Sequence, residues 1–181
     1  MMPKRLPHRW LLGCTLLACS AMLPAVEQDL PGPWAVQVGW SGLDVKTRDL
    51  IGGNKGLLLG LAWYDERRGL FGEMGLNVTY RSANGDDGRS DIIGAAYEER
   101  VPWQQQVYGG LGFGLWYARL ADREGGKVIN GLAPGAKAFI GYQFPKAVSG
   151  VRSALELTVL GTLPVHETSA SGITAGLVVG F

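Results

Sequence analysis

Residues 171–181, S-G-I-T-A-G-L-V-V-G-F, alternate in twos between larger apolar residues and smaller or polar ones. The apolar face holds Ile173, Ala175, Leu177, Val179 and Phe181. A period of two is the period of a β-strand, so the stretch predicts a strand with one wide apolar face. An unpaired apolar edge strand invites aggregation, and pairing it with the first strand of the chain would close a barrel and remove that edge.

Seven earlier segments alternate in the same way. We predict strands at residues 34–41, 56–64, 71–81, 90–99, 106–118, 134–144 and 151–163. Most approach the ~9–11 residues that a tilted strand needs to cross a bilayer. Residues 44–54 and 119–131 are charged or Gly-containing and predict the two longest loops, whereas residues 65–69 and 100–105 predict short turns. An even strand number places both ends of the chain on one side of the membrane, the periplasmic side.

The orientation of the two faces separates a membrane barrel from a water-soluble one. A membrane barrel turns bulky aliphatic residues toward lipid and small or polar residues toward its interior. Here the uniform bulky face carries Leu, Val, Ile and aromatic residues, and the opposite face carries Gly, Thr, Gln and charges. The sequence therefore predicts an all-β fold, an eight-stranded antiparallel up-and-down transmembrane β-barrel.

Charged residues fall on the predicted inner face. They are Glu73, Arg81, Glu98, Lys137 and Glu156. An eight-stranded barrel is just wide enough for side chains to fill it, and buried charges need partners. We predict an internal network of ion pairs and hydrogen bonds, with Lys137 and Glu156 paired because they lie on neighbouring strands. The alternative is that these charges face water on an ordinary sheet.

Aromatic residues gather at the ends of the predicted strands. One set would lie at the periplasmic ends: Trp34, Trp63, Phe71, Tyr97, Tyr142, Phe144 and Phe181. Trp40, Tyr80 and Tyr117 fall at the opposite ends. Two aromatic girdles at the membrane interfaces are typical of outer-membrane barrels. Gly110, Gly112 and Gly114 alternate within one predicted strand, so space in the interior explains them better than a phosphate-binding loop does.

The first 25 residues predict a secretory signal peptide, which leaves residues 26–181 as the barrel domain. Lys4, Arg5 and Arg9 precede a mostly apolar run at residues 10–23, which is shorter than a membrane-spanning helix. Both cysteines, Cys14 and Cys19, lie in this leader. A mature chain without cysteine excludes disulfides and zinc–thiolate sites. An alternative is a lipoprotein box at residues 16–19, with Cys19 lipidated.

The mature chain is close to neutral. Three of the 17 Lys and Arg residues lie in the leader, whereas all 16 Asp and Glu residues lie beyond it. Nucleic-acid binding calls for a basic patch or stripe, so this balance argues against it.

In strand number, size, leader and final phenylalanine, residues 26–181 resemble the small bacterial outer-membrane β-barrels, such as the membrane domain of outer-membrane protein A and outer-membrane protein X. The resemblance implies a monomer in the cell outer membrane, in contact with outer-membrane lipid and lipopolysaccharide. It also implies that the barrel-assembly machinery recognises the last strand with Phe181 as its insertion signature.

We expect no catalysis and no cofactor or metal. The expected role is structural, or binding of a surface ligand through the loops at residues 44–54 and 119–131. One alternative is a lipid A-modifying hydrolase or acyltransferase, since enzymes of both kinds share this barrel size. His166 is the sole histidine of the mature chain and could act with Ser169 or Ser171, but Thr168 stands where a His-x-Ser pair needs serine. A second alternative is a soluble periplasmic barrel that binds an apolar ligand.

Overall fold

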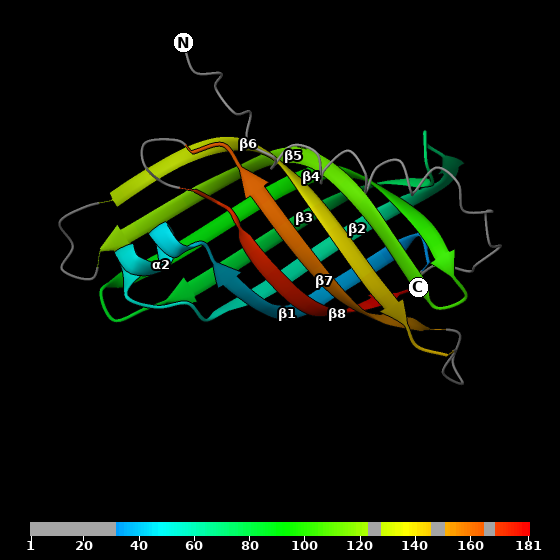
Figure 1. Cartoon of the computed structure of the whole chain (residues 1–181), viewed down its shortest axis with the longest axis horizontal. Helices are drawn as coiled ribbons and strands as arrows, with labels where there is room; N and C mark the ends of the chain where they lie inside the picture. Colours follow the sequence, from blue (N-terminus) through cyan, green and yellow to red (C-terminus); the bar gives the residue numbers. More distant parts are fainter. Residues whose placement is uncertain (1–31, 123–127, 146–150, 165–168) are drawn as a thin grey trace, which may run out of the picture.

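The chain forms a closed barrel of eight antiparallel strands, each paired with its neighbours in sequence order (Figure 1). The computed structural model describes residues 32–122, 128–145, 151–164 and 169–181. The elements are β1 (Trp34–Leu43), α2 (Val45–Ile51), β2 (Gly56–Arg68), β3 (Glu73–Asn84), β4 (Gly88–Gln104), β5 (Val107–Asp122), β6 (Val128–Gln143), β7 (Arg152–Thr162) and β8 (Gly172–Gly180). The predicted fold class is confirmed, whereas the predicted leader and His166 lie outside the described residues.

The first and last strands close the barrel. β1 pairs with β8 over nine residues on each strand, from Ala35 opposite Gly180 to Leu43 opposite Gly172. Beyond the Ala35–Gly180 pair Phe181 N donates to Trp34 O at 2.9 Å, and Trp34 N donates to Phe181 O at 3.3 Å. Closure therefore gives the apolar last strand a partner on both sides, as the alternation at residues 171–181 predicts.

The bulky apolar side chains face outward. On four different strands Leu57, Leu111, Leu157 and Leu177 are all exposed, while the charged residues of the opposite face turn into the barrel. The predicted aromatic girdle residues Trp34, Trp63, Phe71, Tyr97, Tyr142, Phe144, Phe181, Trp40 and Tyr117 are exposed as well, and Tyr80 is half-buried. This arrangement is the inverse of a soluble barrel, whose large apolar side chains fill the centre.

Several strands are longer than predicted. The turn expected at residues 65–69 lies almost wholly in β2, the turn at 100–105 is mostly part of β4, and β5 and β6 take in much of the loop expected at 119–131. Charged residues and Pro102 led to these wrong boundaries. Pro102 is tolerated because the β4–β5 register shifts between it and Gln104, at the end of the ladder. In β2, β5 and β6 the strand pairing likewise continues through polar residues to the ends of the hairpins.

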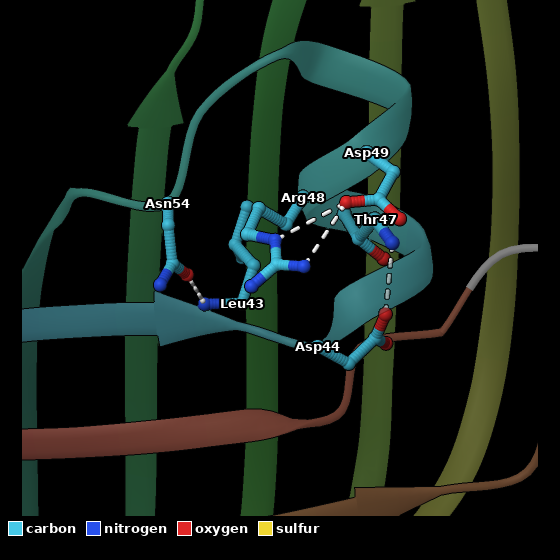
Figure 2. A network of polar contacts seen from close by, with 6 residues as sticks. All are labelled: Leu43, Asp44, Thr47, Arg48, Asp49 and Asn54. Atoms are coloured by element: carbon cyan, nitrogen blue, oxygen red, sulfur yellow. Dashed lines mark hydrogen bonds and ion pairs between the residues drawn. The ribbon is translucent and has the colours of Figure 1, made fainter.

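A short helix, α2, replaces the loop predicted at residues 44–54 (Figure 2). The Asp44 side chain accepts a hydrogen bond from Thr47 N at 2.8 Å and caps the first turn. Gly52 ends the helix in the left-handed region, at φ 68°, where glycine carries no steric penalty. Asn54 Oδ1 accepts from Leu43 N at 2.9 Å and ties the end of the connection back to β1.

Helix α2 lies over the end of the barrel opposite the chain's C-terminus (Figure 1). Ile51, which is 2 % exposed, packs with Ala83 of β3 and Leu120 of β5. Thr47 Oγ1 donates to the Ser169 carbonyl of the β7–β8 connection at 3.1 Å. Helix α2 is therefore held over this end of the barrel by contacts with β3, β5 and Ser169. No helix in the described segments is long and apolar enough to cross a membrane.

We expect Asp44→Ala to loosen α2 without unfolding the barrel. Loss of an N-cap costs about 0.5–2 kcal/mol, and here the loss falls on one short helix at the barrel's end. Amide hydrogen exchange should accelerate at residues 47–51, while the urea midpoint of the barrel changes little. Asp49→Ala is the matched control because Asp49 is exposed on the same helix and its recorded side-chain partner is the adjacent Arg48. Equal exchange in both variants would contradict the capping role.

Candidate functional site

The barrel interior is filled by aromatic rings that lie over glycines. Tyr64 stands directly opposite Gly75, and a Cβ added to Gly75 would fall against its ring. Tyr108 covers Gly141 in the same way. Trp116 covers Gly94. All three rings are buried. Each glycine therefore supplies, on the neighbouring strand, the space that its ring occupies.

Glu98 of β4 is the centre of the interior polar network. It forms an ion pair with Lys137 of β6 and accepts a hydrogen bond from the Tyr64 hydroxyl. β5 lies between β4 and β6, and Gly112 of β5 stands opposite both Glu98 and Lys137. A Cβ on Gly112 would lie 3.0 Å from Lys137 Cε and 3.1 Å from Glu98 Cβ. The absence of a side chain at Gly112 is therefore what lets the ion pair reach across a whole strand.

This pairing differs from the predicted one between Lys137 and Glu156. In the β6–β7 register Lys137 stands opposite Leu160, whereas Glu156 stands opposite Gly141, four residues further along β6. Glu156 instead accepts hydrogen bonds from Gln37 at 3.2 Å, from the Tyr108 hydroxyl at 3.1 Å and from Thr158 at 3.2 Å. The predicted pair is wrong because two residues on neighbouring strands come into contact only when the register places them opposite each other.

Arg100 extends the network toward the end of the barrel where Trp34 and Phe181 lie. Its Nη2 lies 2.7 Å from Glu73 Oε2, and its guanidinium carbon lies 3.3 Å from the centre of the Tyr64 ring. Arg100 is 2 % exposed and Glu73 is 31 % exposed, so the pair runs from the buried interior to the rim. Arg100 falls in the turn predicted at residues 100–105, which contains Pro102. Continued alternation with buried Glu98 was the signal that could have found it.

Arg81 lies in the other half of the barrel, toward α2. It is buried and its Nη2 donates to the backbone carbonyl of Ala170 in the β7–β8 connection. Arg81 therefore ties this connection to the barrel wall.

The interior side chains are suited to holding the barrel together more than to chemistry. Of the predicted network, Arg81, Glu98, Lys137 and Glu156 are buried and Glu73 lies at the rim. With Arg100 added, this network holds three acids and three bases, so the formal charge of the network balances. Gln37, Tyr64 and Glu156 help line a small polar cavity with room for about one water molecule. Within the described residues no cluster of three or more His, Cys, Asp or Glu side chains could hold a metal ion.

The serines considered for catalysis support the local backbone. Ser169 Oγ donates to Ser171 Oγ at 2.6 Å, and Ser171 Oγ accepts from Thr162 N at 2.9 Å. Ser171 N donates back to Ser169 Oγ at 3.0 Å. These hydroxyl groups thus close the turn before β8. Their proposed base, His166, lies in a segment outside the described residues.

Together these features define a class: an eight-stranded up-and-down barrel with an apolar outer wall and a filled polar interior, the architecture of small transmembrane barrels. Among solved structures the chain is similar to Neisserial surface protein A, at 16 % identity over 84 % of this chain and 100 % of that one, with a TM-score of 0.52. It is also similar to the outer membrane protein Ail of Yersinia pestis, at 11 % identity over 83 % and 99 % of the chains, with a TM-score of 0.49. No family model matches the chain, and no curated protein matches it by sequence.

Proposed function

We propose that this protein is a small integral barrel of the bacterial outer membrane, exported by its first 25 residues and monomeric. The observation that carries the proposal is the outer wall, where large apolar side chains of all eight strands are exposed around the barrel. Soluble monomers rarely expose apolar patches beyond a few hundred Å². A bilayer is the environment in which such a wall is stable. The fold shared with Neisserial surface protein A supports the same assignment.

The interior favours a role other than transport. Tyr64, Tyr108 and Trp116 are buried across the lumen, and the Glu98–Lys137 ion pair spans it between β4 and β6. A wide aqueous path would need these side chains to move. The protein therefore acts as a non-enzymatic scaffold, or through surface contacts of its α2 connection and of the β5–β6 hairpin. Outer-membrane lipid and lipopolysaccharide are its expected surroundings, and the barrel-assembly machinery, through the strand that ends at Phe181, is its expected partner.

Membrane fractionation with a heat-dependent gel shift tests the localisation. We expect the protein in the outer-membrane fraction, resistant to extraction with carbonate, and faster on a gel when unheated because the folded barrel stays compact in detergent. The intact mass should equal that of residues 26–181. A mass that corresponds to a lipidated Cys19 would overturn the predicted cleavage site. Recovery in the soluble periplasm would overturn the membrane assignment and favour the ligand-binding barrel.

Mass spectra of lipid A test the non-enzymatic part of the proposal. Cells with and without the protein should give the same lipid A profile. A loss or gain of an acyl chain that depends on the protein would overturn it. Ser169→Ala and Ser171→Ala would then show which hydroxyl group the activity needs, with Ser153→Ala on β7 as the control.

A further inference from the structure

The β2–β3 connection, Gly69 to Gly72, carries apolar side chains into an exposed turn. Leu70 is 88 % exposed, the largest fraction among the large apolar residues of the described segments, and Phe71 is 63 % exposed. Gly69 N donates to Gly72 O at 2.6 Å and closes the turn. Turns in water favour Gly, Pro, Asn, Asp and Ser at their tips. Two large apolar residues at this tip therefore need a contact that the described part of the chain does not supply.

Glu99 of β4 fixes where this turn lies. Leu70 N donates to Glu99 Oε1 at 3.2 Å, and Phe71 N donates to Oε2 at 2.9 Å. Its neighbours Glu98 and Arg100 are buried inside the barrel, so alternation places Glu99 on the outer wall. The turn is consequently held against the outside of β4 and does not fold over the open end of the barrel.

The two glycines of the turn allow this close approach. A Cβ added to Gly72 would fall on the backbone carbonyl of Arg100, and one added to Gly69 would fall on the Glu99 carboxylate. The backbone contact at Gly72 cannot be relieved by moving a side chain. The turn is thus pressed directly onto β4, with the Leu70 and Phe71 side chains left exposed.

The carboxylate that holds the turn is satisfied as an anion. Glu99 lies between Tyr97 and Val101 on the outward face of β4, and the Tyr97 hydroxyl donates to Glu99 Oε1 at 2.8 Å. With the backbone amides of Leu70 and Phe71, the Tyr97 hydroxyl gives the Glu99 carboxylate three hydrogen-bond donors. Hydrogen bonds to a charged acceptor are about twice as strong as neutral ones.

The outer wall beside the turn indicates what covers it. Leu111 stands opposite Glu99 on β5, and it is exposed together with Tyr97 and Leu76 on the lipid-facing side. The exposed aromatic residues Trp34, at the start of β1, and Phe181, just after β8, belong to the same end of the barrel. The turn thus continues the apolar belt at the level where aromatic girdles meet a membrane interface.

We propose that the Leu70–Phe71 turn is an interfacial anchor that inserts into the phospholipid leaflet at the periplasmic face, and that Glu99 is the positioning residue that holds it there. The inference rests on the proposed function as a membrane barrel. Its occupant is lipid, since the turn lies on the lipid-facing wall beside the apolar belt. A periplasmic protein that docks on the turn would instead leave it in water when the barrel is alone in a bilayer.

The test uses a nitroxide spin label in the full chain refolded into phosphatidylethanolamine–phosphatidylglycerol vesicles. Cys14 and Cys19 are replaced by Ser, and Leu70→Cys carries the label, with Phe71→Cys as a second site should the first variant fail to fold. Gln105→Cys is the control because Gln105 is an exposed polar turn residue at the same end of the barrel. We expect the label at position 70 to collide with oxygen dissolved in lipid and to be shielded from a water-soluble nickel chelate, and the label at position 105 to do the reverse.

The role of Glu99 is tested by adding Glu99→Ala to the labelled chain. Access of the nickel chelate to position 70 should rise several-fold. Asp91→Ala is the matched control, since Asp91 is on the same strand, is only partly buried and also accepts a tyrosine hydroxyl, from Tyr80 at 2.7 Å, but does not contact the turn. Equal nickel access at positions 70 and 105 would overturn the anchor, and an unchanged value in Glu99→Ala would overturn the positioning role. A chain that shows no heat-dependent gel shift and no vesicle insertion would instead overturn the proposed membrane barrel itself.

Discussion

Replacing Lys137 with Met lowers the urea midpoint of the barrel in detergent micelles or vesicles, by the equivalent of about 3–5 kcal/mol, the usual cost of removing one partner from a buried ion pair. The loss is large because Glu98 lies inside the barrel, where water cannot replace the ammonium group. The Tyr64 hydroxyl still donates to Glu98 but supplies no full charge. Unfolding followed by tryptophan fluorescence and by the heat-dependent gel shift measures the change.

Two further variants separate the ion pair from the loss of a lysine as such. Lys46→Met removes an exposed lysine from α2 and should leave the midpoint within error, because surface charges contribute little. The double variant Lys137→Met with Glu98→Gln should recover much of the loss, since neither buried group then lacks a counter-charge. A midpoint in Lys137→Met equal to that of Lys46→Met would show that the ion pair does not stabilise the barrel.

The sequence alone predicts whether a strand residue faces the lipid or the barrel interior. It does not predict which interior side chains contact one another. Alternation correctly turned Leu57 and Leu157 outward and Lys137 and Glu156 inward, because a strand leaves two choices and one face is plainly apolar. The partner of Lys137 depends on the register of β4, β5 and β6 and on the gap at Gly112. Neither can be read from one strand, so the predicted Lys137–Glu156 pair was wrong in detail.

The missed helix and the misplaced strand ends have a common cause. Residues 45–51 form too short a helix for a 3.6-residue period to be recognised, and only the capping residues Asp44 and Gly52 mark it. The ends of β2, β4, β5 and β6 carry charged residues that indicate turns by composition. At these ends the partner strand decides whether the ladder continues, and a single-strand pattern does not contain the partner.

Gly141→Val should destabilise the barrel by about 3 kcal/mol, which combines overpacking with the loss of a hydrogen bond to a buried group. A side chain at Gly141 would occupy the position of the Tyr108 ring, which is completely buried. Displacing that ring also removes the hydroxyl group that donates to Glu156. Urea unfolding in micelles and the heat-dependent gel shift measure the effect.

Gly161→Val is the matched control, because Gly161 lies on the exposed face of β7 and a Cβ there would meet nothing within 4 Å. Since valine suits a strand better than glycine, this variant should be as stable as the parent or slightly more stable. Tyr108→Ala added to Gly141→Val should restore part of the loss, because it empties the space that the valine needs. Unfolding of Gly141→Val and Gly161→Val at the same urea concentration would show that Gly141 is not needed to accommodate the Tyr108 ring. It would contradict the inference that glycines make space for the aromatic rings of the interior.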